Sequence, residues 1–139
     1  MALRCFAFLL CILPVSVFSQ EVTKEEAKAV REIIEAQMDA FKRDDGARAW
    51  SFASPEIRKI YPSPEEFMEM VRSFYRAAYR PENVVFQKPV RQGAQIVQPV
   101  RLTDAEGRSW IAYYPVIKLP DGSWRINGCQ LARLQGQET

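Results

Sequence analysis

The spacing of hydrophobic residues is helical from about residue 20 to residue 80 and strand-like from about residue 83 onward. The first helical stretch begins at Thr23, which has the capping-box spacing to Glu26. Its apolar residues recur at helical intervals and form one stripe: Ala27, Val30, Ile34, Met38 and Phe41. The pattern therefore predicts a long amphipathic helix. Gln37 lies on the side of this stripe, so its amide is expected either to bond a neighbouring backbone or to face a ligand.

Three further helix starts follow. Asp45 can cap a short helix over residues 47–52, while Ser54-Pro55 and Ser63-Pro64 each place a capping serine before a proline at the first helical position. The last start predicts a helix over about 64–79. Its main apolar stripe is Phe67, Met70, Val71, Phe74 and Ala78, and its second shoulder is Met68, Tyr75 and Tyr79. The shoulder needs another neighbour, which can be ordinary core, a lid, a pocket or a second subunit.

Four strands are expected, over residues 84–88, 94–102, 109–119 and 124–134. Turns that end in glycine separate the last three, which predicts an antiparallel meander. Pro99 and Pro115 cannot donate to a ladder, so each is expected to mark a bulge or an unpaired stretch, and Asn127-Gly128 is a further candidate bulge. The fold class is α+β, with N-terminal helices packed on a mainly antiparallel four-stranded sheet. A single domain is expected over 20–139, with its core at about 24–134.

The strand over 109–119 is apolar at both odd and even positions, which indicates that both of its faces are covered. Helices can cover one face. The other face needs an interface, so we expect a homodimer that forms through the sheet.

Residues 1–19 are typical of a secretory signal peptide. The apolar run from Cys5 to Val17 is shorter than the ~20 residues that a membrane-spanning helix needs. Cleavage is expected after Ser19, which predicts a secreted or periplasmic protein with no membrane segment. Cleavage would also leave Cys129 as the single cysteine, and we interpret it as a small buried hydrophobe.

Composition excludes several kinds of chemistry. With 19 Lys+Arg against 17 Asp+Glu, the chain has no basic excess to bind nucleic acid. It contains no histidine, which removes a Ser-His-Asp or Cys-His site, any His-ligated metal and the commonest general base near neutral pH. No metal-ligand cluster or phosphate-binding loop is present either, so no cofactor is expected.

Several short motifs occur in order along the chain: Ile34-x-x-Gln37-x-x-Ala40-Phe41, Asp44-Asp45, Ala49-x-x-Phe52-Ala53-Ser54-Pro55, Phe67-x-x-Met70-Val71, Tyr79-Arg80-Pro81 and a block from Asp121 to Cys129. Through them the chain resembles a bacterial family called domain of unknown function 4864, within the nuclear transport factor 2-like (SnoaL-like, cystatin-related) superfamily. The resemblance implies helices followed by a curved antiparallel sheet that together form a cone. Because the family is uncharacterised, the resemblance implies little about function.

Enzymes of that superfamily generally place an acid, a histidine or both inside a cone-shaped pocket. Here every carboxylate after Asn83 lies in an expected turn or in the tail: Asp104, Glu106, Asp121 and Glu138. A strand-borne proton shuttle is therefore absent. The polar groups left for a pocket are Gln37, Tyr75, Tyr113 or Tyr114, and Gln130, from which we select Gln37, Tyr75, Tyr114 and Gln130 as candidate ligand-binding residues.

The sequence favours a non-catalytic module that binds a small apolar ligand or a partner protein. One alternative is a hydrolase- or isomerase-type enzyme that uses Asp44 or Asp45 as its base, although capping of the next helix also explains these residues. Another is a purely structural homodimer.

Overall fold

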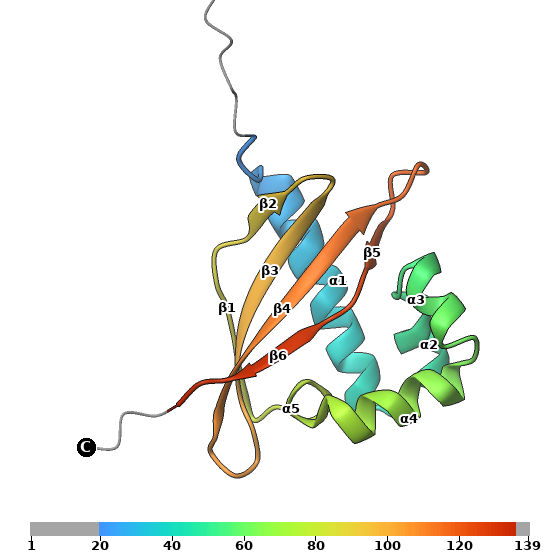
Figure 1. Ribbon diagram of the computed structural model, residues 1–139. Helices are drawn as coiled ribbons and strands as arrows, with labels where there is room; N and C mark the ends of the chain where they lie inside the picture. The colour runs from blue at the N-terminus through green and yellow to red at the C-terminus, as the bar shows by residue number, and fades with distance from the viewer. Residues whose placement is uncertain (1–19, 136–139) are drawn as a thin grey trace, which may run out of the picture.

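The structure is a computed structural model that describes residues 20–135, and the expected signal sequence lies outside the described residues. Helices pack against a strongly curled antiparallel sheet, which confirms the α+β class (Figure 1). The helices are α1 (Lys24–Lys42), α2 (Gly46–Ser51), α3 (Pro55–Ile60), α4 (Pro64–Phe74) and α5 (Arg76–Tyr79). The strands are β1 (Asn83–Phe86), β2 (Val90–Gln92), β3 (Gln95–Thr103), β4 (Ser109–Lys118), β5 (Trp124–Ile126) and β6 (Gln130–Arg133). None of the described helices combines the length and apolar character needed to cross a membrane.

The sheet has four strand positions, and two short strands fill each outer position. The long strands β3 and β4 form a central antiparallel hairpin. β1 and β2 both pair with β3, while β5 and β6 both pair with β4. The expected meander is therefore present. β2 lies in a segment expected to be irregular, and the strand expected over 124–134 is divided in two.

Prolines in the central hairpin lie opposite the interruptions in both edges. Residues 87–89, between β1 and β2, face only Gln98 and Pro99. In the same way, residues 127–129, between β5 and β6, face only Tyr114 and Pro115. Each edge thus carries one additional residue, which is the definition of a bulge, and bulges bend a strand and increase its twist. The bulges expected at Pro99, Pro115 and Asn127-Gly128 are confirmed.

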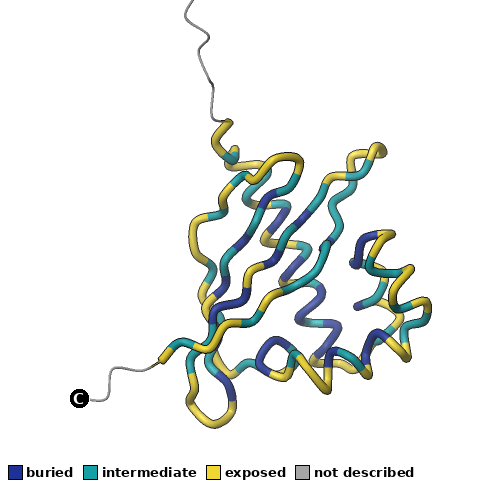
Figure 2. Tube along the Cα trace, in the orientation of Figure 1, coloured by how far each residue is buried: buried dark blue, intermediate teal, exposed yellow. Residues whose placement is uncertain are grey.

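Helix α1 provides the layer behind the sheet. The capping box at its start is present, with Thr23 accepting from the Glu26 amide at 3.1 Å. Its expected apolar stripe is buried at Val30, Ile34, Met38 and Phe41. Figure 2 shows this buried side of α1 lying against the buried positions of the central strands. The helical period of the sequence therefore fixes the face that α1 buries.

The link between α2 and α3 closes the free edge of β5. Ala53 forms an isolated parallel bridge with Ile126, and the Ser54 amide donates to the Ile126 carbonyl at 2.8 Å. The Ser54 hydroxyl, fully buried, accepts from the Ile57 amide and donates to Oδ1 of Asn127 at 2.7 Å. One serine therefore caps α3 and also attaches that helix to the bulge between β5 and β6.

The helix expected over 64–79 is interrupted at Tyr75, whose backbone (φ −126°, ψ 39°) is not helical. The expectation that Phe74 belongs to the buried stripe is wrong, because its side chain is 77% exposed. After the break, the small side chains of Ala77 and Ala78 face the core instead. Tyr75 itself packs against both hydrophobic clusters of the protein.

Ser54→Ala is expected to lower the free energy of unfolding by about 1–3 kcal/mol, because it removes a helix cap and leaves the buried side of Asn127 without its donor. Urea denaturation followed by circular dichroism measures the change. Ser63→Ala is the matched control: Ser63 also precedes a proline and caps a helix, but its bonds stay within α4 and its cap is exposed. The control should cost no more than about 1 kcal/mol. Equal losses in the two variants would contradict a tertiary role for Ser54.

Candidate functional site

A cavity of about 200 Å³ lies where the two hydrophobic clusters of the protein meet. One cluster joins α1 to the sheet, and the other joins α1 to α2 and α4. Its lining is mainly apolar and aromatic: Gln37, Phe41, Ala53, Ile57, Ile60, Tyr61, Phe67, Met70, Val71, Tyr75, Ala78, Tyr114, Ile126, Gly128 and Cys129. None of these lining residues carries a charged side chain.

The cavity wall combines elements that are distant in sequence. α3 and α4 contribute one side, with Ile60, 65% exposed, at the rim. β4, β5 and the bulge that follows β5 contribute the other. The Trp50 indole reinforces the first side, because its Nε1 donates to the Tyr61 carbonyl at 2.8 Å and holds the end of α3. The site therefore depends on tertiary packing of the short helices against the sheet.

Gln37 has both of the roles that the sequence leaves open. Its Nε2 donates to the Ala49 carbonyl at 3.1 Å, which ties α1 to α2. The same side chain, 4% exposed, also lines the cavity. Its principal donor is thus occupied by the protein backbone, and Gln37 is available to a ligand chiefly through its carbonyl oxygen.

Tyr114 projects from the inner face of β4 into the cavity wall. It is 2% exposed, and no group among residues 20–135 forms a hydrogen bond with its hydroxyl. Burial raises the pKa of Tyr114 well above its usual range, and the adjacent Cys129 thiol raises it further. A buried hydroxyl without a partner is rare in native structures and costs stability. Tyr114 is therefore the least satisfied polar group at this site.

Cys129 lies in the bulge between β5 and β6, and its thiol is beside the Tyr114 hydroxyl. It is a free cysteine. Burial raises the pKa of the thiol to about 12, so it stays protonated at neutral pH and is a poor nucleophile. Sequence reasoning did not place Cys129 at the site, because its position depends on the bulge that shifts the strand register.

The other candidate residues separate by strand face and by helix. Tyr75 lines the cavity from the break between α4 and α5, and burial raises its pKa. Gln130 is exposed and lines a neighbouring hollow on the sheet, which shares Tyr75, Gly128 and Cys129 with the cavity. The structure thus brings Gln37, Tyr75 and Tyr114 together and leaves Gln130 outside. Tyr113, the alternative to Tyr114, is on the opposite face of β4 and 41% exposed.

Asp44 and Asp45 lie away from the cavity. Asp45 caps α2 by accepting from the Arg48 amide at 3.1 Å. Asp44 accepts from the Tyr79 hydroxyl and pairs with Arg80 and Arg72, and these contacts, the Tyr79 bond first, hold the pKa of its carboxyl below the usual range. A lowered pKa weakens a general base, and the geometry offers neither aspartate a route to the cavity.

Comparison with protein families gives one match, which covers residues 23–139 and is described as a domain of unknown function (DUF4864). The chain belongs to the DUF4864 family. Searches of the curated proteins and of the solved structures gave no significant match. Within the described part of this DUF4864 chain, histidine, cysteine and acidic side chains form no group of three that could hold a metal ion.

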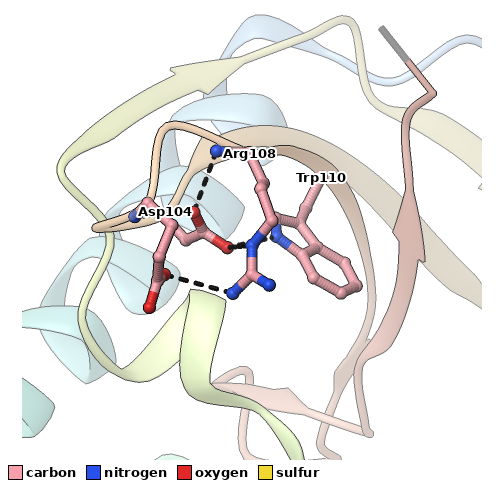
Figure 3. Close-up of polar contacts among 4 residues, drawn as sticks. Asp104, Arg108 and Trp110 are labelled. Carbon is pink, nitrogen blue, oxygen red and sulfur yellow. Dashed lines mark hydrogen bonds and ion pairs between the residues drawn. The ribbon is translucent and has the colours of Figure 1, made fainter.

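The DUF4864 domain has one buried carboxylate, Asp104 in the turn between β3 and β4 (Figure 3). Desolvation acts to raise its pKa, but hydrogen bonds from the Trp110 indole and from Arg108, and the Arg108 charge, outweigh it and hold the pKa of Asp104 well below its usual range. The indole Nε1 donates at 2.9 Å and the Arg108 Nε at 2.7 Å. With its oxygens occupied in this way, Asp104 fixes the hairpin and is not a free acid or base.

Tyr114→Phe is expected to leave the free energy of unfolding of the ligand-free protein unchanged, or to raise it by up to about 1 kcal/mol, because it removes a hydroxyl that is buried without a partner. Urea denaturation provides the measurement. Tyr113→Phe, on the exposed face of the same strand, is the control and should have no effect. A loss of about 1 kcal/mol or more in Tyr114→Phe would show that the hydroxyl is bonded in the folded protein.

Asp104→Asn is expected to destabilise the protein at neutral pH, and the difference from wild type should shrink as the pH falls. Since the folded-state pKa of Asp104 is lowered, its contribution is present above the ordinary aspartate value of about 3.9 and is lost on acidification below it. Thermal denaturation at several pH values from 7 down to 3 measures the convergence. The control is Glu106→Gln, which changes the exposed second partner of Arg108 and should have little effect. Parallel curves for wild type and Asp104→Asn would contradict this assignment.

Proposed function

We propose that this DUF4864 protein is a secreted or periplasmic, non-catalytic module that binds a small apolar ligand in the cavity between its helices and its sheet. The observation that carries the proposal is a cavity of about 200 Å³ whose lining is apolar, aromatic and uncharged. An engineered apolar cavity of ~150 Å³ in another protein binds benzene. The volume here therefore suits a substituted benzene or an alkyl group of similar bulk.

The energetics of packing also support an occupant. Native cores leave few voids larger than a water molecule. An enclosed cavity of about 200 Å³ costs on the order of 5 kcal/mol at the rate measured for core cavities. A ligand that restores van der Waals contacts with Phe41, Phe67 and Ile126 would recover part of that free energy.

Three further features belong to the proposal. The signal-like residues 1–19 support secretion or a periplasmic location. The curled sheet closed by helices supports placement in the nuclear transport factor 2-like superfamily. Exposed Val85, Val90 and Tyr113 on the outer side of the sheet support a homodimer formed through that face. A partner protein on this face is the alternative to a second copy.

Ala78→Leu is expected to abolish binding of a cavity-sized hydrocarbon, because Ala78 lines the cavity and a leucine there occupies ligand space. Isothermal titration calorimetry with isopropylbenzene on the mature protein measures the affinity. Ala47→Leu adds the same side chain at an exposed position on α2 and should bind like wild type. Met70→Trp, at a partly exposed lining position, blocks the cavity independently if Ala78→Leu fails to fold. Absence of hydrocarbon binding by the wild-type protein, or unchanged binding by both blocking variants, would contradict the proposal.

A further inference from the structure

The Tyr114 hydroxyl is the one buried side-chain group of the cavity lining that has no hydrogen-bond partner among the described residues. Its residue is 2% exposed, so bulk water does not reach it. Its neighbour at the wall is the Cys129 thiol, and thiols are weak hydrogen-bond partners. Tyr61 and Tyr75 also line the cavity, but both are partly exposed. An unmet donor therefore lies at one defined point of an otherwise apolar surface.

We infer that the ligand is a neutral, mainly hydrocarbon molecule with one oxygen, of the carbonyl class, that accepts a hydrogen bond from the Tyr114 hydroxyl. This inference rests on the proposed ligand-binding function and adds the chemical class of the ligand. The apolar part of the molecule contacts the aromatic lining, and the oxygen lies between Tyr114 and Cys129.

Neutrality follows from the composition of the lining. No lysine, arginine or histidine lines the cavity, so a carboxylate would enter without a counter-charge. The desolvation of an unpaired ionised group is far more costly than that of a neutral oxygen. An ammonium group meets the same difficulty, because no acidic side chain lines the cavity.

The direction of the hydrogen bond follows from the donors available at the wall. The Gln37 Nε2 donor is used by the Ala49 carbonyl. The hydroxyl proton of Tyr114 is not used, and the raised pKa of Tyr114 keeps that proton in place throughout the neutral range. A carbonyl oxygen, which accepts and does not donate, satisfies this group directly. The thiol of Cys129 can approach the second lone pair of the same oxygen.

Three probes of matched size test the inference by calorimetry on the full mature protein: acetophenone, isopropylbenzene and benzoate. Acetophenone carries the neutral carbonyl, isopropylbenzene replaces it with hydrocarbon, and benzoate replaces it with a charge. We expect the wild type to bind acetophenone and isopropylbenzene but not benzoate. In Tyr114→Phe the acetophenone affinity should fall about five- to tenfold, while the isopropylbenzene affinity stays unchanged or improves.

Tyr113→Phe is the matched control, since it removes a hydroxyl from the same strand on the face away from the cavity, and it should alter neither affinity. Retained isopropylbenzene binding shows that Tyr114→Phe still folds with its cavity open. Equal acetophenone binding by wild type and Tyr114→Phe, or tight benzoate binding, would overturn the inference and leave the proposed function standing. Failure of isopropylbenzene and acetophenone alike to bind the wild type would instead overturn the proposed function.

Discussion

The structure depends on two prolines that cannot donate hydrogen bonds from the middle of the central hairpin. Pro99 and Pro115 lie opposite the places where the two edges of the sheet are interrupted and gain a residue. Such bulges bend and twist the strands that carry them, and the sheet curls around α1. At Pro115 the bulge also brings Gly128 and Cys129 to the cavity wall. A local backbone property of proline is thereby connected to the shape of the candidate site.

The cavity persists because the short helices are fixed by polar contacts that do not fill the space between them and the sheet. Ser54 joins α3 to the bulge, Gln37 joins α1 to α2, and Trp50 holds the end of α3. These bonds set the position of the helices independently of the side chains that face the cavity. Two hydrophobic clusters consequently pack well by themselves and leave an apolar space where they meet.

Features with a local cause could be predicted from the sequence. The capping box at Thr23, the serine caps before Pro55 and Pro64, and the prolines in the strands each act through neighbouring residues, and all are present. The break at Tyr75 and the exposure of Phe74 could not be predicted, because the helical period continues through them and tertiary packing overrides it. The cavity itself joins residues from 37 to 129, and no spacing in the sequence encodes such a contact. Tyr113 and Tyr114 separate only when the strand register decides which face points inward.

The central claim is that Tyr114 lacks a protein partner because the cavity is built to hold another molecule. A crystal structure of the protein as purified, without added ligand, tests this most directly. The account predicts compact electron density inside the cavity, with an atom about 2.6–2.9 Å from the Tyr114 hydroxyl. A cavity closed by repacked side chains, with the hydroxyl bonded to a protein group, would contradict it.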